Sequence, residues 1–155
     1  MMSSISLQHF QFARRGTLGL LKGINETKWD EQPIGFPNNI RWNAGHIFVS
    51  AEFFLHQADE EYEMKHGDWA GLFATGTKPA DWSNNIPSAS DIISALEEQA
   101  KRVEAHFRDK TVNSASKSVT IGPLEMNTVD ALVQFNTFHE GNHIGIIKSL
   151  NNVLK

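Results

Sequence analysis

The sequence predicts an all-α protein that folds as a four-helix bundle, and three observations support this prediction. Four segments repeat apolar residues at spacings of three and four, which is the period of an amphipathic helix. The segments between them contain proline, glycine and asparagine, which favour loops. The polar segment before the last helix contains one short β-branched run, "SVTI", so little β-structure is expected. At 155 residues and without an internal repeat, the chain is expected to form one domain over residues 1–155.

The first two predicted helices are separated by a loop. The first helix covers residues 5–25, where apolar residues such as Phe10 and Leu21 recur on one face. The segment "WDEQPIGFPNN" contains two prolines, so it is expected to be the loop. Asn38 or Asn39 can then cap a second helix over residues 40–65. From Gly67 to Pro87 the pattern is broken, which indicates a long connection across the bundle.

The last two predicted helices begin at recognisable caps. Ser88 is followed three residues later by Asp91, a pattern close to a capping box, so the third helix is expected to begin there. A polar segment over residues 110–127 follows it. Asn127 or Thr128 then caps a fourth helix that runs nearly to the C-terminus. Bundles of this kind build metal sites between facing helices.

Composition excludes several classes of function. The net charge is -4, the sequence pI is about 5.9, and charges of both signs are interspersed, so no nucleic-acid partner is expected. No apolar run has the length of a membrane span, and the N-terminus lacks the features of a signal peptide. We therefore expect a cytoplasmic protein without a membrane partner. The chain has no cysteine, which excludes thiolate ligands and a cysteine nucleophile.

Residues 139–143 read "HEGNH", which matches the helical H-E-x-x-H zinc motif of metallopeptidases. The third ligand of such a site normally lies downstream. The twelve residues after His143 contain no histidine, aspartate or glutamate. Glu140 is also turned by about 100° from His139 around a helix, and the sequence offers little strand against which a peptide could lie. We therefore do not expect a peptidase.

Three histidines occupy positions whose helical period points inward. His139 and His143 fill a gap in the apolar stripe of the fourth helix, and His46 does the same in the second. One such histidine is usually a hydrogen-bonded core residue. Three histidines on helices that pack together can each find a partner for a ring nitrogen by binding one ion. Two histidines four residues apart on a helix are close enough to reach the same ion. His46, His139 and His143 are therefore the predicted metal ligands. The other histidines are expected outside the site: His9, His56, His66 and His106.

Three further residues are candidates for a supporting role. Asn43 and Asn136 lie one turn before His46 and His139, where they could contact a ligand or the substrate, or could simply be exposed. Trp42 could form a wall of the pocket, although an ordinary core position is the stronger expectation.

The combination of "NIRWNAGHI" and "FHEGNHIGII" resembles the DinB/YfiT-like superfamily, and the resemblance extends over nearly the whole chain. It implies a four-helix bundle with up-down-down-up topology and a long crossover connection. It also implies a divalent metal ion, nickel or zinc, held by His46, His139 and His143, and a homodimer. Relatives of this type include thiol transferases. The resemblance thus implies an enzyme that transfers a low-molecular-weight thiol, its co-substrate, to an electrophilic small molecule.

Two other functions remain open. Three neutral imidazoles leave an ion its full charge, which favours a bound thiolate without any protein cysteine. The same site could instead ionise water in a metal-dependent hydrolase. A third hypothesis is a non-catalytic bundle whose metal site is structural or vestigial, which a fourth protein ligand would favour. The sequence assigns no catalytic residue.

Overall fold

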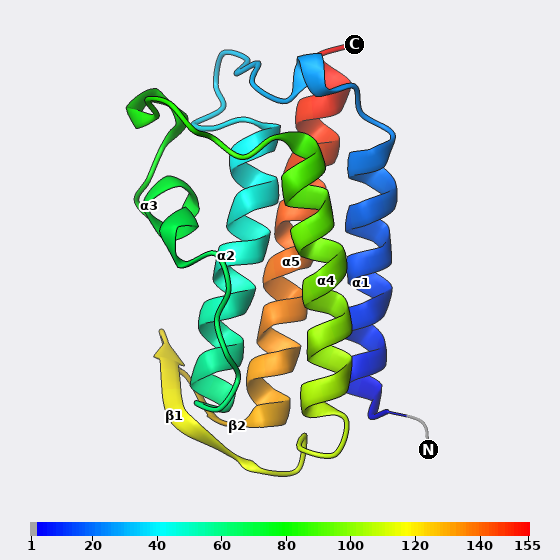
Figure 1. The fold of residues 1–155 in the computed structure, drawn as a ribbon, viewed down its shortest axis with the longest axis vertical. Helices are drawn as coiled ribbons and strands as arrows, with labels where there is room; N and C mark the ends of the chain where they lie inside the picture. The colour runs from blue at the N-terminus through cyan, green and yellow to red at the C-terminus, as the bar shows by residue number, and fades with distance from the viewer. Residues whose placement is uncertain (1–2) are drawn as a thin grey trace.

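The computed structural model describes residues 3–155 and shows a mostly helical chain with five α-helices and one small hairpin (Figure 1). The long helices are α1 (Ile5–Lys22), α2 (Ile40–Ala58), α4 (Ala89–Phe107) and α5 (Val129–Val153), and α3 (Ala70–Phe73) is a single turn. Figure 1 shows α1 and α5 running in one direction and α2 and α4 in the other. In chain order the long helices therefore run up, down, down and up. The prediction of a helical fold is confirmed.

Short polar side chains fix the beginning of each long helix. Ser4 accepts a hydrogen bond from a backbone N–H in the first turn of α1, and Asn39 and Thr128 do the same for α2 and α5. Ser88 and Asp91 form a complete capping box at the start of α4. These bonds satisfy backbone donors that have no partner within the helix. The caps of α2, α4 and α5 are among those expected from the sequence.

Two predicted helices are shorter than expected. α1 ends at Lys22 rather than near residue 25, because a separate 3₁₀ turn begins at Glu26 with Asn25 as its cap. α2 ends at Ala58 rather than at residue 65. Asp59 has extended backbone there, and its carboxylate pairs with His106 of α4 at 2.7 Å, so the chain leaves the helix axis.

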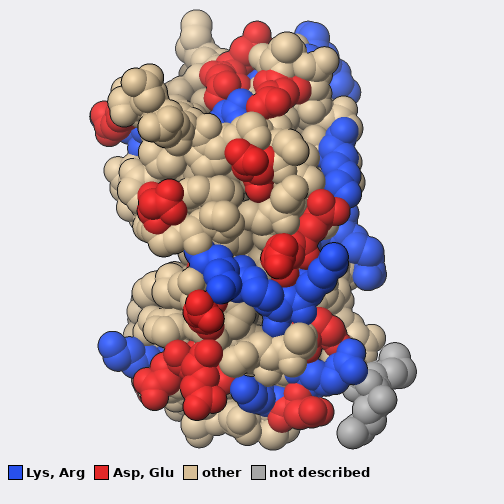
Figure 2. Space-filling view, in the orientation of Figure 1, with Lys and Arg blue, Asp and Glu red and all other residues tan. Residues whose placement is uncertain are grey.

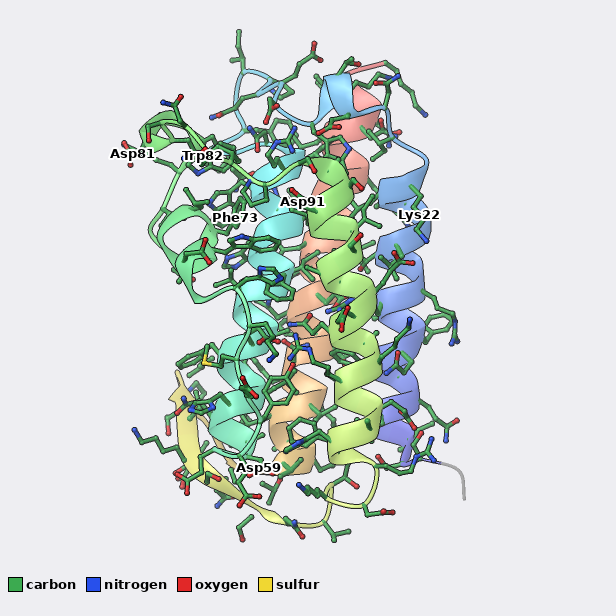
Figure 3. The ribbon with its side chains drawn as sticks, viewed as in Figure 1. Lys22, Asp59, Phe73, Asp81, Trp82 and Asp91 are labelled. Atoms are coloured by element: carbon green, nitrogen blue, oxygen red, sulfur yellow. The ribbon has the colours of Figure 1, made fainter. Side chains whose placement is uncertain are left out.

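The segment after α2 crosses the bundle, as predicted, and it is more ordered than its sequence indicates. It contains α3 and the 3₁₀ turns Gly67–Trp69 and Pro79–Asp81. Trp69 and Phe73 are buried, and the Phe73 ring packs edge-on against Trp82 at 5.6 Å. Figure 3 shows Phe73 and Trp82 on this connection beside the upper part of α2. The connection therefore covers one side of α2.

A hairpin precedes α5, which corrects the expectation of little β-structure. Strands β1 (Ser114–Ile121) and β2 (Leu124–Thr128) pair antiparallel, and Ile121 lies opposite Leu124. The turn between them contains Gly122 with φ of 57°, a left-handed conformation that glycine adopts without a steric cost. The strand β2 runs directly into α5 and so fixes where that helix begins.

The apolar core is divided by a layer of buried polar side chains. One cluster contains Trp29, Phe48 and the C-terminal part of α5, and the other contains Phe10 and the N-terminal part of α5. Buried polar residues lie between these clusters along each long helix: Arg14, Thr17, Glu52, Gln99, Asn136 and Glu140. We call these six residues the polar layer. Its charges are paired, as burial of charge requires.

The face in Figure 2 carries charges of both signs. Lysine and arginine side chains form a band across the middle, and acidic side chains lie on both sides of it. A mixed surface of this kind agrees with the interspersed charges of the sequence. Among the described residues, no helix is both long and apolar enough to cross a membrane.

Candidate metal centre

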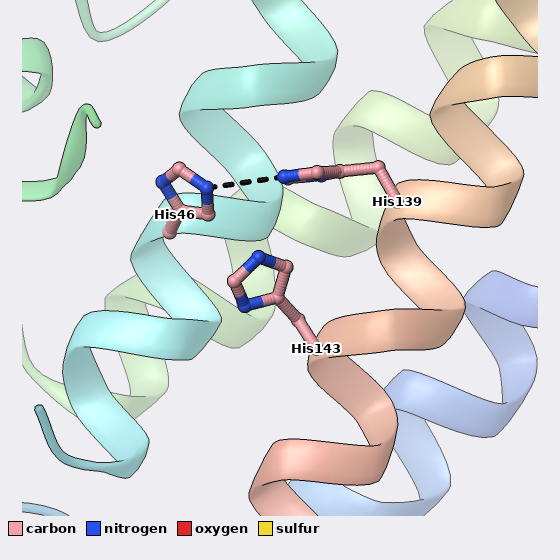
Figure 4. Close-up of side chains that lie close together, drawn as sticks. All are labelled: His46, His139 and His143. Atoms are coloured by element: carbon pink, nitrogen blue, oxygen red, sulfur yellow. Dashed lines mark hydrogen bonds between the residues drawn. The ribbon is translucent and has the colours of Figure 1, made fainter. Parts of the chain in front are cut away.

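The packing of α2 against α5 brings together the three predicted ligands. One ring nitrogen from each of His46, His139 and His143 lies within 4.8 Å of the others (Figure 4). The Nε2 atoms of His46 and His139 are 3.2 Å apart. Two nitrogens bound to one tetrahedral ion at roughly 2.0–2.1 Å would stand about 3.3 Å apart. The spacing of this pair therefore fits a shared ion, and the assignment of the three residues as ligands stays a prediction.

The orientation of His46 is set from the long connection. Its Nδ1–H donates to the carbonyl oxygen of Phe73 at 2.7 Å, so the lone pair of Nε2 is directed into the cluster. The ring of Trp42 stacks on the imidazole with a centroid distance of 4.5 Å and an angle of 12°. Gly45 makes this arrangement possible, because a Cβ atom there would overlap the ring of Phe73.

His143 is held by a chain of asparagines. Its Nδ1 atom lies 2.7 Å from Oδ1 of Asn43 and donates to it. The Nδ2 group of Asn43 donates in turn to Oδ1 of Asn38 and to the carbonyl oxygen of Asn39, both at 2.8 Å. These bonds fix which end of the amide faces the imidazole. A ligand histidine commonly has such a partner on its second nitrogen, which leaves the first free to bind metal.

The histidine cluster is electrically neutral at neutral pH. Burial, followed by the charge of the neighbouring His46, lowers the pKa of His139 to about 4. Burial, followed by the charges of His46 and His139, lowers the pKa of His143 to about 3. Burial also lowers the pKa of His46, although its bond to Phe73 opposes the shift. Neutral imidazole is the form that binds a metal ion.

Glu140 lies on another side of α5 and takes no part in the cluster. Its carboxylate accepts two hydrogen bonds from the guanidinium of Arg14, at 3.0 and 2.9 Å, and one from Thr17 Oγ1 at 2.6 Å. Glu140 and Arg14 are each 1% exposed. The glutamate of "HEGNH" therefore joins α5 to α1 and does not face the position where a catalytic base would stand.

The other residues considered from the sequence differ in their relation to the cluster. Trp42 is a wall of the site as well as a core residue, and Asn43 supports His143 rather than His46. Asn136 is buried, and its Nδ2 atom has no hydrogen-bond partner in the described part of the chain. The other histidines lie outside the cluster and are engaged elsewhere or exposed: His9, His56, His66 and His106.

The sequence analysis missed two groups that contact the cluster. The Oγ atom of Ser50 lies 3.3 Å from Nε2 of His46. Ser50 follows His46 by four residues, so helical spacing could have found it. The contact with the Phe73 carbonyl could not be predicted from the sequence, because residue type does not show which backbone group of an irregular connection a side chain will meet. Among the described residues the possible metal-binding group contains three histidines and no carboxylate.

The chain also matches a known protein family. A family model described as the DinB superfamily matches residues 9–147. The chain belongs to the DinB superfamily. The match extends from α1 into the last turns of α5 and includes all three clustered histidines. Among curated proteins, none matches this DinB-superfamily chain significantly.

Proposed function

We propose that this DinB-superfamily protein is a divalent-metal-dependent enzyme that transfers a low-molecular-weight thiol to an electrophilic small molecule. The observation that carries the proposal is the convergence of three neutral imidazoles, two of them with Nε2 atoms 3.2 Å apart, without a carboxylate among them. The up-down-down-up order of the helices supports the YfiT-like resemblance on which the thiol chemistry rests.

His46, His139 and His143 are the residues that would hold the ion, nickel or zinc. When bound there, the ion supplies a positive charge that favours an anionic ligand and lowers the pKa of a coordinated thiol. All three protein donors are uncharged, so the protein does not offset that charge. The chain has no cysteine, so the sulfur that reacts belongs to the substrate.

The surrounding residues keep the donors in place and limit the access of water. Phe73 and Asn43 hold the Nδ1 atoms of two histidines, so the donors do not have to reorganise when the ion binds. Trp42 covers the ring of His46, and Phe54 contacts His139 edge-on at 6.1 Å. In the proposed reaction the thiol sulfur forms a bond to the electrophilic carbon. The leaving group takes the electron pair, and the thiol proton passes to solvent.

The first test is the metal content of the purified protein, measured by elemental analysis. We expect near-stoichiometric nickel or zinc in the native protein and none in a variant with His46, His139 and His143 all changed to alanine. The matched control is His9→Ala, which removes an exposed histidine of α1 and should leave the metal content unchanged. A native protein that takes up neither added nickel nor added zinc would overturn the proposal.

The second test separates the enzymatic hypotheses. The metal-loaded protein is incubated with an aryl halide or epoxide, with and without cysteine or glutathione, and loss of the electrophile is followed by chromatography. Loss that requires both the thiol and the three histidines supports thiol transfer. Loss at the same rate without thiol would favour the hydrolase instead. If the triple variant also consumes the electrophile, the three histidines do not form a catalytic metal site.

A further inference from the structure

A row of four phenylalanine rings lies beside the three histidines. It begins with Phe53 and Phe54 of α2 and continues with Phe135 and Phe138 of α5. Neighbouring ring centroids are separated by 5.4, 5.2 and 5.8 Å. Phe54, inside the row, also contacts the ring of His139. This phenylalanine row therefore borders the candidate metal centre directly.

Both ends of the row are open to solvent. Phe53 is 47% exposed and Phe138 is 64% exposed, so the row ends in exposed apolar surface, and contiguous surface of this kind can mark a binding site. Phe135 and Phe138 also line a hollow of about 480 Å³ between β2 and α5, together with Leu124 and Met126. Pockets for small molecules measure roughly 300–1,000 Å³ and are mostly apolar. The hollow has the size and character of a ligand subsite.

Charge restricts what the hollow can bind. Among the described residues that line it, Asp130 alone carries an ionisable side chain, and its carboxylate also accepts a hydrogen bond from Gln134. A ligand group with a negative charge would be repelled by this carboxylate and would lose its hydration against the phenyl rings. A neutral alkyl or aryl group would gain free energy from the apolar surface that it covers.

We propose that the phenylalanine row and the adjoining hollow bind a neutral apolar tail of the substrate, while the polar group of the same molecule reaches the three histidines. The inference rests on the proposed function and names its substrate class, an amphiphilic small molecule. Phe135 precedes His139 by one helical turn, or about 6 Å along the axis. A tail must span this distance before it enters the hollow. The concave shape and the contact with His139 favour a small molecule over a second copy of the chain.

The test uses hydroxamates, which bind divalent ions through a constant polar group. Acetohydroxamate and octanohydroxamate are titrated into the zinc-loaded full-length protein by isothermal calorimetry. Burial of a methylene favours binding about fourfold, so burial of roughly half of the longer chain predicts affinity on the order of a hundredfold higher for octanohydroxamate. The Phe53→Ala/Phe138→Ala variant should lose most of this difference. Phe12→Ala, which removes an exposed phenylalanine of α1, should retain it.

Each other outcome has a defined meaning. Equal affinities for the two hydroxamates would overturn this inference and leave the metal centre standing. Protein that takes up neither zinc nor nickel would overturn the inference together with the proposed function. A chain-length effect that the double variant and Phe12→Ala share equally would show non-specific binding and also overturn it. If the two hydroxamates bind with equal affinity and Phe138→Arg converts a native dimer to a monomer, this surface binds a second copy of the chain.

Discussion

Replacement of Glu140 by alanine should destabilise the protein strongly, because it leaves Arg14 buried without its anionic partner. The carboxylate of Glu140 accepts three hydrogen bonds, two from Arg14 and one from Thr17. After the substitution, Arg14 retains only the bond from Nη1 to the carbonyl oxygen of Leu96 at 3.0 Å. Removal of one partner from a buried ion pair costs about 3 to 5 kcal/mol. We expect a loss of this size, which is a large part of the stability of an ordinary domain.

The assay is urea unfolding of the metal-free protein, followed by circular dichroism at 222 nm. The matched variant Arg14→Met/Glu140→Leu removes both charges and keeps the volume apolar, so it should recover most of the lost stability. A loss below about 1 kcal/mol for Glu140→Ala, the level of an exposed pair, would refute the assignment of Glu140 to the core. A catalytic glutamate of a peptidase would behave in the opposite way, with activity lost and stability kept.

Three further predictions concern the histidine cluster. Asn43→Ala should weaken zinc binding by roughly 10- to 100-fold, because it removes the partner of the second ring nitrogen of His143, and competition with a chromophoric chelator measures this. Gly45→Ala should weaken zinc binding and lower Tm, because the new Cβ displaces Phe73; equal Tm values by calorimetry would contradict the packing. The pKa values of His139 and His143 in the folded protein are about 4 and about 3. Below pH 6.5 the unfolded chain therefore binds more protons than the folded protein does. The metal-free protein should therefore lose stability as the pH falls from 7 to 5, and this loss should be smaller when both histidines are alanine; equal pH dependence in urea unfolding would contradict the burial.

The features that sequence predicted well are those that one segment encodes by itself. The period of α5 and the gap at His139 and His143 depend only on residues within that helix. Ser88 and Thr128 cap their helices through bonds that span three residues. His46 lies on another helix, but its inward position follows from the same local period. The meeting of the three side chains then requires only that the two helices pack together.

The features that sequence did not predict depend on partners distant in the chain. The bond between His46 and the Phe73 carbonyl joins a helix to an irregular connection, and no side-chain pattern marks a backbone acceptor. The end of α2 at Ala58 coincides with the pairing of Asp59 with His106 of α4. Helical propensity within residues 59–65 gives no indication of that contact, and tertiary packing overrides it.

The motif "HEGNH" shows how the residues of a metalloprotease pattern can be directed to different neighbours on one helix. Successive residues on a helix are separated by about 100°, so His139 and Glu140 must face different neighbours. In this chain α2 lies on the histidine side and α1 lies on the glutamate side. The same five residues thus supply two candidate metal ligands and one half of a buried ion pair. That ion pair fixes the rotation of α5 against α1, and the rotation in turn directs both histidines toward His46. The geometry of the histidine cluster is therefore coupled to the polar layer, and we expect Glu140→Ala to weaken zinc binding through the fold rather than through the loss of a ligand.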